Sequence, residues 1–122
     1  MSRADQILKE IKTLSSTTPD VEAAAVIDND GLMIASALGA DMDDDAVAAM
    51  GAALLGLGER SASELTRGDF EMVMIRGGDG YLMLVRSGHD SVLCVLTSRN
   101  AKLGLIFLDV SRAAKEVGRL LG

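Results

Sequence analysis

Residues 46–57 read AVAAMGAALLGL, and this stretch has a helix start signal in the three aspartates at 43–45 but no polar face. A surface helix carries one apolar stripe, whereas a helix that is apolar all round is covered on more than one side. At about 100° per residue, Val47, Met50, Leu54 and Leu57 form one stripe, and Ala48, Ala52, Leu55 and Gly56 lie on roughly the opposite side. We expect the first stripe to face a sheet, and the second, a ridge of small side chains, to be an interface with another chain.

Composition narrows the class of protein. A chain of 122 residues is expected to form a single domain, 1–122, that buries a core without disulfides or metals, and one cysteine excludes an internal disulfide. The charged N-terminal segment lacks the apolar centre of a signal peptide, and no apolar run approaches the ~20 residues that span a bilayer. These features predict a cytoplasmic protein without membrane insertion. The net charge of −6, with one tyrosine and two phenylalanines, argues against binding to nucleic acid.

Helix and strand signals alternate along the chain. Helices are predicted from Ser2 to about Leu14, from Asp43 to an end between Gly58 and Leu65, and over 100–122. Strands are predicted at 21–27, 32–36, 70–76, 81–85 and 92–97, and the Gly-containing turns at 28–31 and 77–80 predict two hairpins. The last run is apolar on both faces, which is typical of a central strand. The order is therefore αββαβββα, with a mostly antiparallel sheet and helices on both faces.

This order, the hairpin VIDNDGLMIAS at 26–36 and the small-residue second helix resemble the roadblock (dynein light-chain) family, and within it the MglB-type regulators of Ras-like GTPases. The resemblance implies an α/β (α+β) sandwich, in which a five-stranded antiparallel sheet carries the second helix on one face and the first and third on the other. It also implies a homodimer whose second helices pack together and whose third strands join two sheets into one. Members act as non-enzymatic partners that change the nucleotide cycle or location of a small GTPase.

Interface residues are predicted on the second helix, where the small-residue ridge lies, and on the third strand, where the resemblance implies that two sheets join. On the second helix they are Ala48, Ala52, Leu55, Gly56 and Glu59, and on the third strand Met72, Val73 and Met74. The charged residues beside the helix pair are the predicted contacts to a GTPase: Glu59, Arg60, Glu64 and Arg67.

Motifs for metals and dinucleotides are incomplete. Asp41, Asp43 and Asp45 spell D-x-D-x-D, but alanines at 46 and 52 occupy the positions where a calcium loop has glycine and glutamate, so helix capping is favoured. The glycines at 56 and 58 follow a helix rather than a strand, which excludes the pyrophosphate-binding geometry. We therefore expect no cofactor and no metal.

No catalytic group is predicted either. His89 is the only histidine and lies in a turn, and Cys94 lies among apolar neighbours in a strand, where burial would raise its pKa. Two alternatives to a GTPase regulator remain open: a small-molecule sensor, because a sheet flanked by helices can enclose an apolar ligand, and an adaptor subunit of a larger signalling complex.

Overall fold

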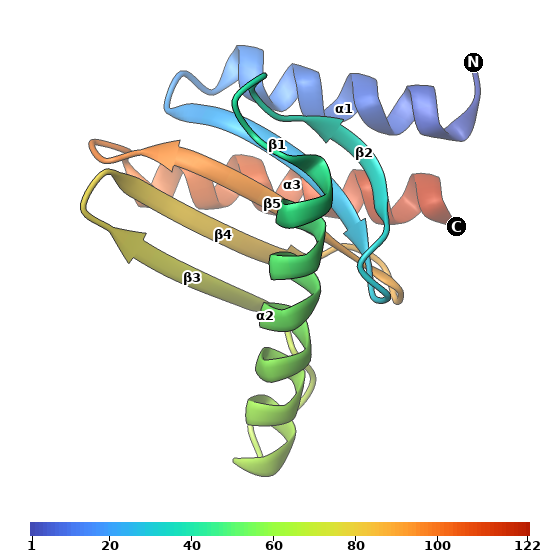
Figure 1. Ribbon diagram of the computed structural model, residues 1–122, viewed down its shortest axis with the longest axis vertical. Coiled ribbons are helices and arrows are strands. Elements are labelled where there is room, and N and C mark those ends of the chain that lie inside the picture. Colours follow the sequence, from blue (N-terminus) through green and yellow to red (C-terminus); the bar gives the residue numbers. More distant parts are fainter.

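The computed structural model describes residues 1–122 and contains three helices and five strands in the order αββαβββα (Figure 1). The elements are α1 (Arg3–Thr17), β1 (Val21–Asp28), β2 (Met33–Ala37), α2 (Asp44–Glu64), β3 (Met72–Gly77), β4 (Gly80–Arg86), β5 (Ser91–Ser98) and α3 (Leu103–Leu121). The predicted order is confirmed. The last helix begins at Leu103 rather than near Asn100, and β3 begins at Met72 rather than at Phe70.

The five strands form one antiparallel sheet in the order β2-β1-β5-β4-β3. Strand β5 pairs with β1 and β4, so the run that is apolar on both faces is the central strand, as predicted. Helix α2 crosses one face alone, and α1 and α3 lie side by side on the other (Figure 1). The α+β sandwich is therefore confirmed, with β2 and β3 as its edge strands.

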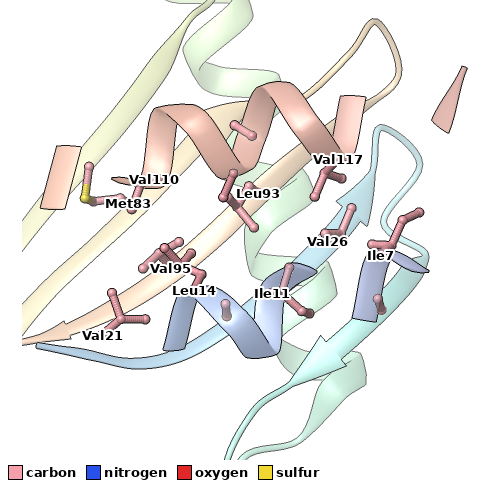
Figure 2. Close-up of a cluster of buried hydrophobic side chains, with 14 of the residues drawn as sticks. Ile7, Ile11, Leu14, Val21, Val26, Met83, Leu93, Val95, Val110 and Val117 are labelled. Carbon is pink, nitrogen blue, oxygen red and sulfur yellow. The ribbon is translucent and has the colours of Figure 1, made fainter. Parts of the chain in front are cut away.

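The larger core lies between the sheet and the α1–α3 layer, by which we mean the helices α1 and α3 together. Figure 2 shows Ile7 and Ile11 of α1 and Val110 and Val117 of α3 pointing toward the sheet. They belong to a cluster of 15 buried residues that also includes Leu93 of the central strand. Each such side chain contributes about 1.5–3 kcal/mol when it is removed from water, so this layer holds most of the fold together.

Local polar contacts set the boundaries of the elements. The side chain of Ser2 accepts a hydrogen bond from the backbone N–H of Asp5, and Asp43 Oδ1 accepts from the N–H of Asp45 at 2.9 Å, so both helices begin at capped ends. In the first hairpin, Asp28 Oδ1 accepts from the backbone N–H groups of Asp30 and Leu32. Asp43 therefore caps α2 and Asp28 closes the turn of the first hairpin, as predicted.

Candidate functional site

Helix α2 packs against the sheet through three buried residues, two of which are small. Its buried residues are Ala48, Gly51 and Leu55. A Cβ on Gly51 would stand 2.7 Å from Ile27 Cδ1, and one on Gly58 would stand 2.6 Å from Phe70 Cε1. Both distances are below any normal contact, so these two glycines mark the face of α2 that touches the sheet.

The predicted interface ridge is wrong for two of its residues. Ala48 is 2% exposed and Leu55 is 1% exposed in the single chain, because both pack into the core cluster on the α2 side of the sheet. The small side chain of Ala48 allows the helix to approach its own sheet closely, and Leu55 fills the core between them. Ala52 is half-buried beside the first hairpin, with its Cβ 3.3 Å from where a Cβ on Gly31 would stand.

The outward face of α2 carries the other stripe. Met50 is 58% exposed and Leu57 is 62% exposed, so the prediction that these two side chains face the sheet is also wrong. Val47 and Leu54 are half-buried against the α2-side core, as expected. The other exposed apolar positions of residues 46–57 are small: Ala46, Ala49, Ala53 and Gly56. The free apolar face of α2 is therefore rotated by about a third of a turn from the predicted ridge.

An apolar groove runs between this face of α2 and the uncovered part of the sheet. It has a volume of about 710 Å³, and its walls include Met50 and Leu54 of α2 and Ile75, Leu82 and Leu96 of the sheet. A second recess of about 560 Å³ adjoins this groove toward the C-terminal end of α2, between Leu57 and β3, and shares Leu54 and Ile75 with it. Helix α2 alone therefore does not cover its face of the sheet, and apolar surface stays exposed between it and β3.

Strand β3 brings a free edge to the same region. It pairs only with β4, which leaves one row of its backbone N–H and C=O groups without a partner strand. Met72 and Val73 are half-buried, whereas Met74 and Ile75 are exposed. An exposed apolar edge strand is a template for pairing with another chain, and three of these residues are in the predicted interface.

The charged residues gather at the C-terminal end of α2, which extends past β3 in Figure 1. Arg60 and Glu64 form an exposed ion pair with 2.9 Å between Nε and Oε1, and Arg67 donates from Nε to the carbonyl of Leu65. Glu59 instead pairs with Arg86 of β4, with 3.4 Å between the charged atoms. Arg60, Glu64 and Arg67 are therefore directed to solvent, whereas Glu59 is partly engaged within the chain.

Arg86 is a residue that sequence reasoning missed. Its guanidinium lies 5.6 Å from the centre of the Phe70 ring and donates to Asn29 Oδ1 at 3.0 Å. These contacts, together with the Glu59 pair, fasten the end of α2 to the hairpin loops. The partners are far apart in sequence, so no local pattern indicates them.

The described residues of this region include no reactive thiol and no group of metal ligands. Burial raises the pKa of Cys94 to about 11, so its thiol stays protonated and unreactive at neutral pH. No cluster of three or more His, Cys, Asp or Glu side chains is arranged to hold a metal ion. None of the three helices combines the length and apolarity that a bilayer-spanning segment requires. What the α2 side offers is an apolar surface with a charged end.

Known proteins share this fold and this sequence pattern. Residues 7–97 match the Roadblock/LC7 domain family. The uncharacterized protein MJ1340 of Methanocaldococcus jannaschii is 36% identical over 113 residues, which cover 93% of this chain and 95% of that protein. Myxococcus xanthus MglB superposes with a TM-score of 0.91 at 20% identity, over 99% of this chain and 91% of that one. An MglB with a tetrameric arrangement superposes with a TM-score of 0.86 at 19% identity, over 98% and 90% of the two chains.

Proposed function

The chain belongs to the Roadblock/LC7 family, and on that premise we propose that it is a non-enzymatic homodimer that regulates or scaffolds a Ras-like small GTPase. The proposal has two parts, the dimer and its partner. The exposed surfaces of this chain support the dimer. The resemblance to MglB-type regulators, whose fold this chain shares, supports the GTPase as the partner.

One observation carries the dimer: the exposed apolar face of α2, the groove beside it and the free edge of β3 all lie on one side of the molecule. A two-fold axis perpendicular to the sheet would join β3 to the same strand of a second chain and bring the two α2 helices together. Met50 and Leu57 would then be covered, and each groove would receive side chains from the other chain. The tetrameric arrangement of an MglB fits a fold that associates with itself.

The interface residues are revised accordingly. Gly56, Met72, Val73 and Met74 stay as proposed contacts, and Ala52 and Glu59 lie at the border of the interface. Met50, Ala53 and Leu57 replace the buried Ala48 and Leu55. An apolar centre surrounded by charged residues is the usual composition of a protein interface.

The GTPase is proposed to bind where α2 ends. Arg60, Glu64 and Arg67 are exposed there, at the edge of the apolar surface, and could contact polar groups of a partner. They would position the GTPase rather than take part in hydrolysis, since no side chain on this surface is arranged for catalysis. In the dimer, two such groups would flank the helix pair.

The experiment is GTP turnover by a small GTPase encoded next to this gene, measured against increasing amounts of this protein. Arg60→Ala and Arg67→Ala are expected to weaken binding but to leave the rate at saturation unchanged. An arginine that stabilises the transition state would lower the saturated rate by about 10³-fold or more. A fall of that size would contradict the non-catalytic role. If the protein binds no such GTPase, the proposal that its partner is a small GTPase is wrong. Lys115→Ala on the opposite face is the matched control.

The alternative of a small-molecule sensor is favoured by one observation, the 710 Å³ groove. Its walls are almost wholly apolar, with the Asp43 cap as the only charged residue, so few polar groups could orient a ligand. A second copy of the chain needs no such groups. The groove therefore supports the dimer better than it supports a ligand.

A further inference from the structure

Charge is distributed unevenly between the two faces of the sheet. The chain has 12 basic and 18 acidic residues. Counting Lys102, which precedes α3, the α1–α3 layer carries seven of the basic residues and four of the acidic ones, a net charge of about +3 on a protein of net charge −6. The basic residues are Arg3, Lys9, Lys12, Lys102, Arg112, Lys115 and Arg119, which include every lysine of the chain. The rest of the molecule is strongly acidic.

The basic groups of this layer face solvent, and its acidic groups are partly neutralised. All seven basic residues are exposed, whereas three of the four acidic residues, Glu10, Asp109 and Glu116, are half-buried and only Asp5 is exposed. Asp109 accepts hydrogen bonds from Thr18 and Arg112. Glu116 pairs with Arg119, and this hydrogen bond lowers the pKa of the Glu116 carboxyl. The outer surface of the layer is therefore positive.

Apolar side chains project from the same surface. Leu105 is 62% exposed and Leu108 is 63% exposed, while Ile106 and Val110 of the same helix are buried in the core. At helical spacing, the outward stripe of α3 continues from these leucines to Arg112 and Arg119. Phe107 is also exposed, toward the β3 edge. Exposed leucines beside basic residues on a helix are typical of segments that lie on a membrane surface.

We propose that the α1–α3 layer binds the surface of a membrane that contains anionic lipids. Leu105 and Leu108 enter the boundary between headgroups and acyl chains, and the basic residues of both helices contact the headgroups. The contact is peripheral and needs no spanning helix. Because this layer is positive and the rest of the protein is acidic, a negatively charged surface attracts this face and repels the others.

A lipid surface fits this layer better than an acidic protein does. The basic residues are spread along two helices rather than gathered around one recess, so they match a broad, evenly charged plane. The recess beside α1 is lined mainly by polar and charged residues, with Leu8 as its only hydrophobic side chain, so it offers little to anchor a peptide. Leu105 and Leu108 stand out from the surface instead of lining a cavity.

A single chain is sufficient for this membrane contact, and the proposed dimer would add a second one. A two-fold axis perpendicular to the sheet leaves both α1–α3 layers on the same side and both α2 helices on the other. The dimer would then present two positive layers to the membrane together, which raises affinity through a second, linked contact. The α2 side would stay free for the GTPase.

The test is co-sedimentation of the full chain with vesicles. Vesicles of phosphatidylglycerol and phosphatidylcholine should retain the protein, and vesicles of phosphatidylcholine alone should not. Raising salt from about 0.05 M to about 0.5 M should lower binding about tenfold or more, because screening weakens the contact to the headgroups. Absence of binding to anionic vesicles at low salt would overturn the proposal.

Variants test which face of the protein contacts the membrane. L105D combined with L108D should lower binding at least about tenfold, whereas Leu32→Asp on the first hairpin, where the leucine is 65% exposed, should leave it unchanged. Acetylation of the lysines, all of which belong to this layer, should have a similar effect without any substitution. Equal binding by the double variant and the Leu32→Asp control would overturn the assignment of the face.

Two further readouts separate this proposal from others. Light scattering on the same samples reports the oligomeric state, so loss of the dimer and loss of membrane binding are recorded independently. Immobilised polyglutamate serves as the probe for an acidic protein partner. If polyglutamate retains the protein and anionic vesicles do not, the membrane proposal is wrong. The partner of the α1–α3 layer would then be an acidic protein.

Discussion

The two faces of the sheet are covered to different degrees. On one face, α1 and α3 together bury a cluster of 15 residues and leave Leu105, Phe107 and Leu108 of α3 exposed. On the other, α2 buries a cluster of eight and leaves an apolar groove and a free edge strand beside it. Two helices complete a hydrophobic core on this sheet, and one does not. The incomplete face is therefore where a second chain is expected to bind.

The largest expected effect is a difference between the two faces in how much a substitution lowers the free energy of unfolding. Ile11→Ala removes a fully buried side chain from the α1–α3 side and should lower the free energy of unfolding by about 2–5 kcal/mol. Leu57→Ala, on the exposed face of α2, should matter only at protein concentrations where the dimer forms. Urea unfolding at several protein concentrations measures both. An Ile11→Ala effect below about 1 kcal/mol would contradict the placement of the main core.

The second effect concerns the smaller core under α2. Burial raises the pKa of Cys94 from 9.0 to about 11, so the folded state holds the thiol proton more tightly than the unfolded state does. The stabilisation is complete below pH 9 and is lost as the pH rises toward 11, and it amounts to at most about 2–3 kcal/mol. Unfolding of wild type and of Cys94→Ala between pH 8 and pH 11 isolates this contribution, as other groups titrate in both. A constant difference between the two proteins would show that water reaches the thiol.

The smallest effect tests which side of α2 touches the sheet. Gly58→Ala places a methyl group against the Phe70 ring and should destabilise the fold by about 1–3 kcal/mol. Gly56→Ala, two residues away in open space, should be neutral or stabilising by up to about 1 kcal/mol, because alanine favours the helix. Thermal unfolding of the two variants gives the comparison. The reverse order would contradict the close approach of Gly58 to the Phe70 ring.

Local sequence signals predicted most of the fold. The aspartates at 28 and 43 form a turn and a helix cap through contacts within a few residues, so their roles follow from sequence. The central strand around Cys94 is apolar on both faces, which a buried strand requires.

The orientation of α2 could not be predicted in the same way. Periodicity shows that a helix has two apolar stripes but not which of them meets the sheet. Contacts from Gly51 to Ile27 and from Gly58 to Phe70 decide this, and they join distant parts of the chain. The two glycines seven residues apart were the available signal. The Glu59–Arg86 pair is equally non-local, so it left no pattern in the sequence.

A second copy of this chain is expected to cover the α2 side of the sheet. Size exclusion with light scattering, at micromolar protein, tests it most directly. The wild type and Leu32→Asp should be dimers, whereas Leu57→Asp should be monomeric but folded, since an unpaired charge in an interface costs about 3–5 kcal/mol. A wild type that is monomeric at these concentrations, or a Leu57→Asp variant that is as dimeric as Leu32→Asp, would contradict the claim.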